Sequence, residues 1–136
     1  MPHLRDTRTL TLDAAKAMAE AAEAFALGRG WTVAVAVVDA AGGLILFHSL
    51  DDTQPASQDV AIHKARAAAR FRRPTKVLED GIAGGRLAML SLGAVSLEGG
   101  VPVMVGEQVL GAIGVSGMQS SQDGEVAQAG ITALRT

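Results

Sequence analysis

The stretch GGVPVMVGEQVLGAIGVSG, residues 99–117, decides the fold. Residues 101–105 and 109–116 are rich in valine and other apolar side chains, and the short Gly106-Glu107-Gln108 turn separates them. Strands joined by so short a turn run antiparallel, because a parallel pair needs a crossover of about a dozen residues or more. The stretch therefore predicts a β-hairpin.

A second hairpin is predicted upstream of this one. Residues 31–38 are rich in β-branched side chains, a glycine-rich turn follows at residues 39–43, and residues 44–47 are apolar again. The second strand continues into His48-Ser-Leu-Asp-Asp52, where polar residues replace the aliphatic ones. Polar side chains are therefore expected at one end of that strand.

Helices are predicted on both sides of the upstream hairpin. Apolar residues recur at helical spacing after Thr11, whose hydroxyl suits an N-cap, and Gly28 ends this first helix. Ser57 is expected to cap a second helix, which runs to about Phe71 and stops before Pro74.

The rest of the chain gives weaker signals. Residues 75–80 are expected to form one helical turn, and the glycines of residues 81–85 a loop. The apolar segment 87–97 fits neither a helix nor a strand clearly. Ser120 with Asp123 resembles a capping pair at the start of a terminal helix.

The order of these elements predicts one α+β domain. A chain of 136 residues fits a single domain. Two consecutive hairpins require an antiparallel sheet, which disfavours a doubly wound α/β fold. We expect residues 1–10 to form an N-terminal tail and residues 11–136 to form the domain.

The composition excludes several classes of protein. With 12 basic and 14 acidic residues, the chain has no bulk attraction for nucleic acid. Cysteine is absent, which excludes disulfides, thiolate metal sites and a cysteine nucleophile. The N-terminus does not resemble a secretory signal, and the apolar runs are too short to span a bilayer. We therefore expect a cytoplasmic protein without membrane contacts.

Common catalytic motifs are absent as well. Residues 111–117 have the wrong spacing for a dinucleotide-binding glycine motif, and Ser116 is not at the centre of a nucleophile elbow. His3, His48 and His63 show no pair at metal-ligand spacing, so no zinc site is expected.

The second predicted helix carries a basic face. Arg66 and Arg70 either receive an anion, such as a carboxylate, a phosphate or a haem propionate, or are simply solvated. Lys64 departs from this face because it falls beside the alanines of the helix. It either forms a structural ion pair with Asp39 or Asp51, or reaches a ligand.

Glycines flank the downstream hairpin on both sides. Gly99 and Gly100 precede it, and Ser116 and Gly117 end it. Glycines allow a ligand or another backbone to approach closely, and they equally mark tight turns and bulges. The spacing alone does not choose between these interpretations.

Several segments together resemble the GlcG/HbpS family, which is also described as the haem-degrading domain family or the domain of unknown function 336. The segments that carry the resemblance are Val35-Ala-Val-Val-Asp39, Leu50-Asp51, Lys64-Ala65, Gly99-Gly100-Val-Pro102 and residues 109–117. They span nearly the whole chain in order. Residues 48–52 depart from the family pattern, because a histidine stands where an arginine is usual and an aspartate where a glycine is usual.

The resemblance implies a profilin-like α+β fold, with an antiparallel sheet of about five strands flanked by helices. It also implies assembly into dimers or octamers, and the binding of haem or a related tetrapyrrole as a small ligand. The ligand is expected near Gly99-Gly100, near Ser116-Gly117 and near residues 48–52, which include Asp51.

Composition then limits how a haem could be held. Axial ligands are usually His, Cys, Met or Tyr, and neither Cys nor Tyr occurs here. Three histidines and five methionines remain; His48 and His63 are the leading candidates for the haem iron, with a methionine as the alternative. The propionates would meet Arg66, Arg70 or Arg73.

Two other functions stay open at this point. One is an enzyme that acts on a small carboxylated metabolite by acid–base chemistry, with Glu107, Asp39 or His48 as acid or base. Lys64 or an arginine would hold the anion. An N-terminal Pro2 amine as the base is a variant of this hypothesis. The other is a non-catalytic, oligomeric accessory protein whose alanine-rich helices offer flat packing surfaces.

Overall fold

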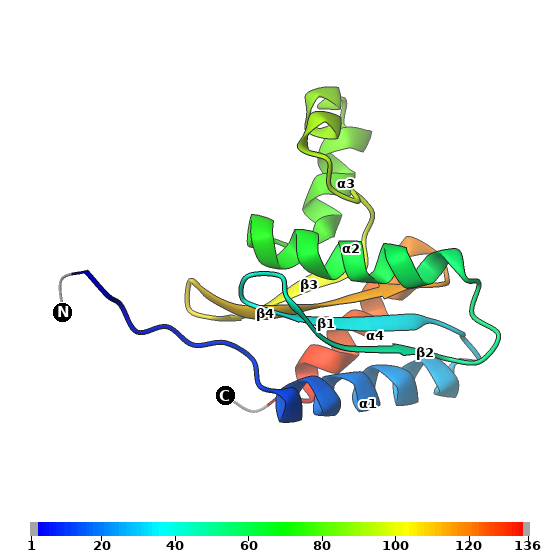
Figure 1. Cartoon of the computed structure of the whole chain (residues 1–136). Coiled ribbons are helices and arrows are strands. Elements are labelled where there is room, and N and C mark those ends of the chain that lie inside the picture. Colours follow the sequence, from blue (N-terminus) through cyan, green and yellow to red (C-terminus); the bar gives the residue numbers. More distant parts are fainter. Residues whose placement is uncertain (1–2, 135–136) are drawn as a thin grey trace.

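The computed structural model describes residues 3–134. Four strands form one antiparallel sheet in the order β2-β1-β4-β3, with helices on both of its faces (Figure 1). In chain order the elements are α1 (Leu12–Gly28), β1 (Ala34–Asp39), β2 (Leu44–Ser49), α2 (Ala56–Phe71), α3 (Thr75–Ala83), the 3-10 helix η1 (Leu87–Leu92), β3 (Gly100–Val105), β4 (Gln108–Ser116) and α4 (Ser120–Thr132). The α+β prediction and both hairpins are confirmed, and the sheet has four strands where about five were expected.

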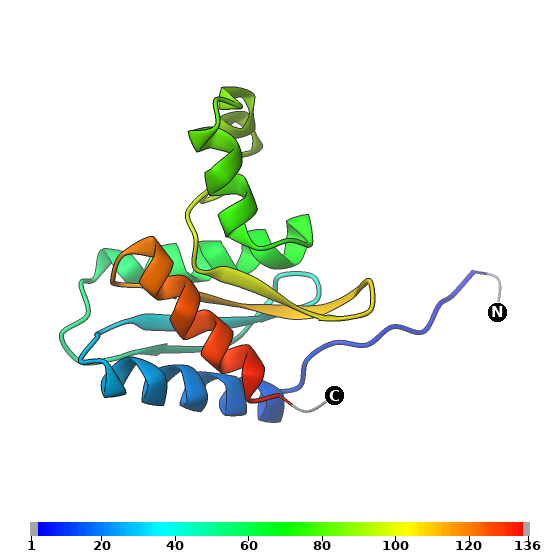
Figure 2. The same ribbon diagram turned by 180° about the vertical axis from the view of Figure 1, so that it is seen from behind.

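Each face of the sheet has its own core. Side chains alternate between the two faces along a strand. Val35 and Val37 of β1 therefore join the cluster of α1 and α4, whereas Ala34 and Ala36 join the cluster of α2. Figure 2 shows α4 crossing beside α1, on the side of the sheet away from α2.

The α2 face is built from small residues. Ala61 and Ala65 of α2 pack in one cluster with Ala112 of β4. Gly114 lies directly under the helix, where an added Cβ would collide with the carbonyl oxygen of Ala61 and the nitrogen of Ala65. Glycine at this position lets the helix backbone rest on the strand, which explains part of the glycine-rich hairpin.

The helix caps agree only partly with prediction. Thr11 caps α1 as predicted, because its hydroxyl accepts a hydrogen bond from Ala14 N at 3.1 Å. Ser57 does not cap α2, which begins one residue earlier at Ala56. The Ser57 hydroxyl is buried inside the first turn and accepts a hydrogen bond from Gln54 Nε2 at 3.0 Å.

The predicted Ser120–Asp123 capping pair is also wrong. Gln119 is the N-cap of α4 and forms a capping box with Gln122. Ser120 instead donates a hydrogen bond to Glu79 Oε1 of α3 at 3.0 Å, and Asp123 turns toward the interior of the domain. The pair is broken because both side chains find tertiary partners.

The segment from α3 through η1 projects from the body of the molecule (Figure 1). α3 continues to Ala83, beyond the single turn predicted, and the Met89 thioether packs against it at Gly81, where a Cβ would collide with the sulfur. The ambiguous apolar segment begins with η1, in which no residue is buried. Among residues 3–134, no helix is both long and apolar enough to cross a membrane.

The segment that precedes α1 is bonded to the beginning of β4. Leu10 belongs to the core of the α1 face, and its N–H donates to Leu110 O at 2.9 Å. Arg8 donates through Nε and Nη2 to Gln108 Oε1 at 3.1 and 3.0 Å. These contacts hold residues 8–10 beside β4.

Candidate functional site

A cavity of about 360 Å³ lies on the outer side of α2. We call it the α2 cavity; its lining residues are His63, Arg66, Ala67, Arg70 and Phe71 of α2, and residues 92–95 opposite. None of these lining residues, all within the described part of the chain, is acidic. The cavity therefore combines an imidazole and two guanidinium groups with an apolar wall, a composition that suits an anionic, largely apolar ligand.

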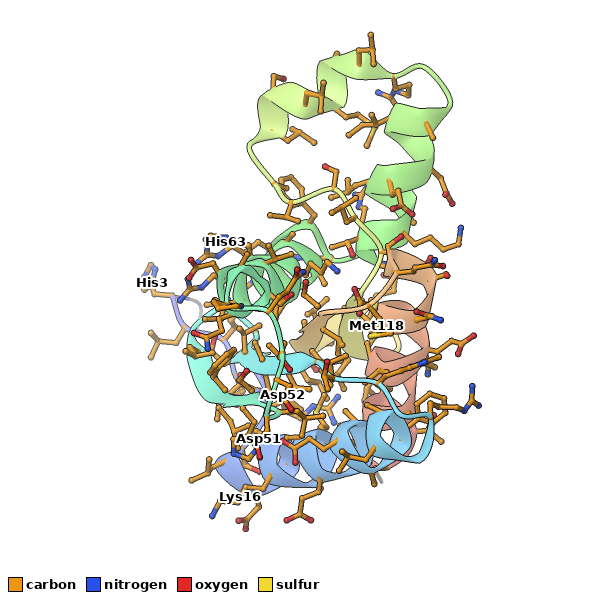
Figure 3. The ribbon with its side chains drawn as sticks, turned by 90° about the vertical axis from the view of Figure 1, so that its right-hand side faces the viewer. His3, Lys16, Asp51, Asp52, His63 and Met118 are labelled. Carbon is orange, nitrogen blue, oxygen red and sulfur yellow. The ribbon has the colours of Figure 1, made fainter. Side chains whose placement is uncertain are left out.

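The helix itself brings these groups together. His63, Arg66 and Arg70 follow one another at spacings of three and four residues, so they share one side of α2. The alanines of the opposite side are buried against the sheet, which turns the polar side chains outward. In Figure 3, His63 lies at the outer surface of α2.

Both arginines are tethered to the β1–β2 turn. Arg66 Nε donates to Gly42 O and Arg70 Nε donates to Ala41 O, each at 3.1 Å. Among the hydrogen bonds found within residues 3–134, both guanidinium groups use Nε only. Both arginines line the cavity, and their Nη groups have no acceptor among the described residues.

Asp39 organises the same turn from inside. One of its carboxylate oxygens accepts hydrogen bonds from the backbone nitrogens of Ala41 and Gly43, at 2.9 and 2.8 Å. A carboxylate engaged in this way shapes a turn. In the structure Asp39 shapes the β1–β2 turn, and the acid–base role considered for it stays a prediction.

Lys64 lies on the inner side of α2 and is almost completely buried, with 1% of its surface exposed. Its Nζ forms an ion pair with Asp123 Oδ2 at 3.1 Å and donates a hydrogen bond to Val115 O at 2.9 Å. A structural ion pair was one of the two interpretations of Lys64, and the structure shows it. The partner is Asp123 of α4, so the prediction of Asp39 or Asp51 is wrong.

The Lys64–Asp123 pair connects α2 with α4, and the hydrogen bond from Lys64 to Val115 O connects both to the C-terminal end of β4. Asp123 Oδ1 also accepts a hydrogen bond from Met118 N at 3.0 Å. Burial raises the pKa of the Asp123 carboxyl, and the charge of Lys64 opposes that rise. The pair is inaccessible to a ligand in the α2 cavity.

Gly99 and Gly100, at the start of β3, allow the backbone to pack closely against Lys64. A Cβ at Gly99 would lie 2.5 Å from Val115 O and 2.8 Å from Lys64 Nζ, and one at Gly100 would collide with Lys64 O. Ser116 is buried, and Gly117 packs with φ +146° against the backbone of Thr32. Gly99 and Gly100 thus lie against Lys64 and Gly117 lies against Thr32, and none of these glycines, nor Ser116, lines the α2 cavity.

His48 and Asp51 lie away from the α2 cavity. His48 Nδ1 is 2.5 Å from Glu23 Oε1 of α1, on the opposite face of the sheet from α2. Asp51 lies in the exposed turn after β2, and Figure 3 shows it far from His63. Of the two histidines proposed for iron, only His63 is therefore beside Arg66 and Arg70.

The remaining candidates are also scattered. Glu107 is exposed in the β3–β4 turn, beside a separate cavity of about 400 Å³ that Arg72 also lines. No cluster of three or more His, Asp or Glu able to hold a metal ion occurs among residues 3–134. Pro2 lies outside the described residues.

Sequence reasoning missed the apolar half of the α2 cavity. Phe71 had been noted only as the end of a helix, and Leu92 lay in a segment without a clear element type. The available signal was the run of uncharged residues at positions 87–97, which is unusual on a surface.

Comparison with known proteins places the chain in a family. A family model described as "Haem degrading protein HbpS-like" matches residues 10–132. The chain belongs to the HbpS-like family. Protein GlcG of Escherichia coli (strain K12) is 40% identical to it over 108 residues, which cover 79% of this chain and 81% of GlcG.

Solved HbpS-like structures share the fold. The crystal structure of a double mutant of HbpS from Streptomyces reticuli has a TM-score of 0.91 and 33% identity, covering 100% of this chain and 94% of that one. A crystal structure of a PduOC–haem complex has a TM-score of 0.83 and 27% identity, covering 93% of this chain and 95% of that one. Membership of the HbpS-like family confirms the resemblance noted from the sequence, and it supports a haem-related role in ligand binding.

Proposed function

We propose that the protein binds haem, or a related tetrapyrrole, in the α2 cavity. The observation that carries the proposal is the convergence of His63, Arg66 and Arg70 on one cavity with an apolar wall. His63 would approach the iron, and the Nη groups of Arg66 and Arg70 would hold propionates. A bound haem would supply redox or oxygen chemistry at its iron.

The size of the cavity indicates a shallow mode of binding. At about 360 Å³ it lies near the lower end of the range for small-molecule pockets, about 300 to 1,000 Å³. Phe71 and Leu92 would contact one face of the ring, and the opposite edge would stay in solvent or meet another subunit. A ring held in this way depends strongly on its polar anchors.

A haemin titration of the purified apoprotein tests this proposal. We expect a Soret band, and quenching of the single tryptophan, Trp31, that saturates at a fixed stoichiometry. His63→Ala should change the Soret position and weaken binding. Replacing Arg66 and Arg70 by glutamine should weaken binding about tenfold for each lost charge-assisted contact, the equivalent of about 1.5 kcal/mol.

His48→Ala is the matched control, because His48 is also an exposed histidine but lies on the other face of the sheet. It should bind haemin as the unaltered protein does. If His63→Ala and the arginine variants keep the original spectrum and affinity, the α2 cavity is not the haem site. If His48→Ala alone loses binding, the site lies at β2.

We also propose that the protein forms a homo-oligomer through the apolar projection, which we define as residues 75–97. The projection exposes Val77, Leu87, Leu90, Leu92 and Leu97, each by 46% or more. An accumulation of exposed apolar side chains of this kind favours an interaction surface. Because Leu92 also lines the α2 cavity, a neighbouring subunit at this surface would lie next to the bound ligand.

A further inference from the structure

A second cavity lies between the start of α3, the start of β3 and α4, and the proposed function does not use it. Its volume is about 290 Å³, and we call it the α3–α4 cavity. Its lining residues are Pro74 and Lys76 at the start of α3, Glu98, Gly100 and Val101 at the start of β3, and Gly124, Glu125 and Gln128 of α4. Three elements that are distant in sequence therefore enclose one space.

Glu98 is the central polar group of this cavity. It is partly buried, and within residues 3–134 burial and neighbouring charges, with no hydrogen bond, act on its carboxylate. The carboxylate lies against Gly124 of α4, where a Cβ would collide with Glu98 Oε2. Glycine at the second turn of α4 thus leaves the space that this carboxylate fills.

The backbone that carries Glu98 is held firmly. Gly99 O accepts a hydrogen bond from Val115 N at 2.9 Å, and Gly100 N donates to the buried Thr75 hydroxyl at 2.9 Å. Gly99 packs against Lys64, which is fixed by its own ion pair. The glycine motif singled out in the sequence therefore presents one carboxylate, without its own partner, at a defined place.

The other charged groups around Glu98 are engaged or exposed. On α3, Lys76 Nζ is paired with Asp80 Oδ2 at 2.7 Å, and Glu79 accepts a hydrogen bond from α4. On α4, Glu125 lies 3.6 Å from Arg29 Nη1 in an exposed pair. The lining holds two carboxylates, Glu98 and Glu125, against the single ammonium of Lys76, so its net charge is negative and favours a cationic ligand over an anionic one.

We propose that the α3–α4 cavity binds a small organic ammonium ion, with Glu98 as its counter-ion. The ammonium would donate hydrogen bonds to the Glu98 carboxylate, and its short alkyl part would lie against Val101 and Pro74. Gln128 offers a further amide oxygen at the rim. A volume of about 290 Å³ corresponds to roughly ten waters of liquid, which is enough for a short alkylammonium.

The electrostatics of Glu98 agree with this occupant. Burial raises the pKa of the Glu98 carboxyl, the carboxylates of Glu79 and Asp80 raise it further, and Lys76 and Lys64 oppose the rise. An ammonium beside Glu98 would stabilise its charged form and lower that pKa. By linkage, affinity for the ammonium must fall as the pH drops and Glu98 takes up a proton.

Nuclear magnetic resonance of the full chain tests the proposal, with n-propylammonium chloride as the probe. We expect the amide signals of Gly100 and Gly124 to shift and saturate as the probe is added. The midpoint of the Glu98 carboxyl titration, followed through its side-chain ¹³C signal, should fall in the presence of the probe. Glu98→Gln should lose about tenfold or more in affinity, because the ion pair is removed.

Glu20→Gln is the matched control, since Glu20 is exposed on α1 and lies away from the cavity. It should bind the probe as the unaltered protein does. 1-Propanol and sodium chloride should give no saturable shift at Gly100. A Glu98→Gln variant that keeps a native spectrum and full affinity would overturn the proposal, as would a Glu98 titration midpoint that the probe leaves unchanged. Neither outcome bears on haem binding at the α2 cavity, which is tested separately.

Discussion

At the scale of single residues, Lys64 shows how far its position in the sequence can be interpreted. Its place beside the alanines of α2 indicated a buried lysine, and a buried lysine needs an anion. Its partner could not be predicted, because Asp123 lies 59 residues further along the chain. Only the packing of α4 on the sheet brings the two charges together. The same holds for His48 and His63, whose separation on opposite faces is a tertiary property.

Replacing Lys64 by methionine should destabilise the protein by about 3 kcal/mol, because Asp123 would be left buried without its cation. The Asp123 carboxyl should then take up a proton, which relieves part of the cost, since burial already raises its pKa. Urea unfolding followed by Trp31 fluorescence measures the free energy of unfolding.

Lys16→Met serves as the comparison, because Lys16 is exposed on α1. That variant should change stability by no more than about 0.5 kcal/mol. Equal losses in the two variants would show that the buried ion pair has no special role.

At the scale of elements, local sequence patterns predicted whether a segment is a helix or a strand better than they predicted where it begins and ends. Both hairpins and the helices α1 and α2 follow from spacing, because each has a regular apolar period and a clear turn or cap. The predicted ends were less accurate, as in α3, which continues through Gly81 to Ala83 although glycine disfavours a helix interior; there the Met89 thioether packs against the helix. The α2 cavity was half predicted: its basic side follows helical spacing, whereas its apolar wall comes from a segment with no periodic signal.

Gly114→Ala tests the close contact between α2 and β4. The new methyl group would collide with backbone atoms of α2, which cannot move aside as a side chain can. We expect a loss of about 2 to 3 kcal/mol in the free energy of unfolding, the cost of an overpacked core. Thermal unfolding followed by circular dichroism measures it.

Gly28→Ala is the corresponding control, because nothing lies within 4 Å of the position that a Cβ would take at Gly28. Its effect should be neutral or slightly stabilising, by up to about 1 kcal/mol. If both alanine variants are equally stable, helix and strand are less tightly apposed than the structure shows.

At the scale of the whole molecule, the apolar projection exposes large apolar side chains that the rest of the chain does not cover. Leu87 and Leu90 are exposed by 64% and 63% on a segment that stands away from the sheet (Figure 1). Such a segment has few intramolecular contacts that would favour leucine over a polar residue. A partner surface accounts for these leucines better than the isolated chain does.

Replacing Leu87 and Leu90 by aspartate should therefore dissociate the proposed oligomer, because two charges would be buried at the contact. Size-exclusion chromatography with light scattering should give a smaller mass, while circular dichroism stays unchanged. Leu12→Asp on α1, another exposed leucine, is the control. A monomer before any substitution would contradict the proposed assembly.

The alanine-lined packing of α2 has a consequence for how this fold can diversify. The inner side of α2 packs against the sheet and contributes to the stability of the fold. Only small side chains fit there, because the helix backbone lies directly on β4 at Gly114. The outer side carries the groups that would choose a ligand, and none of them supports the core. Residue 63 can therefore change without disturbing the core, whereas changes at Arg66 and Arg70 would also release their hydrogen bonds to the β1–β2 turn. The same scaffold can thus present different side chains to a ligand on the outer side of α2.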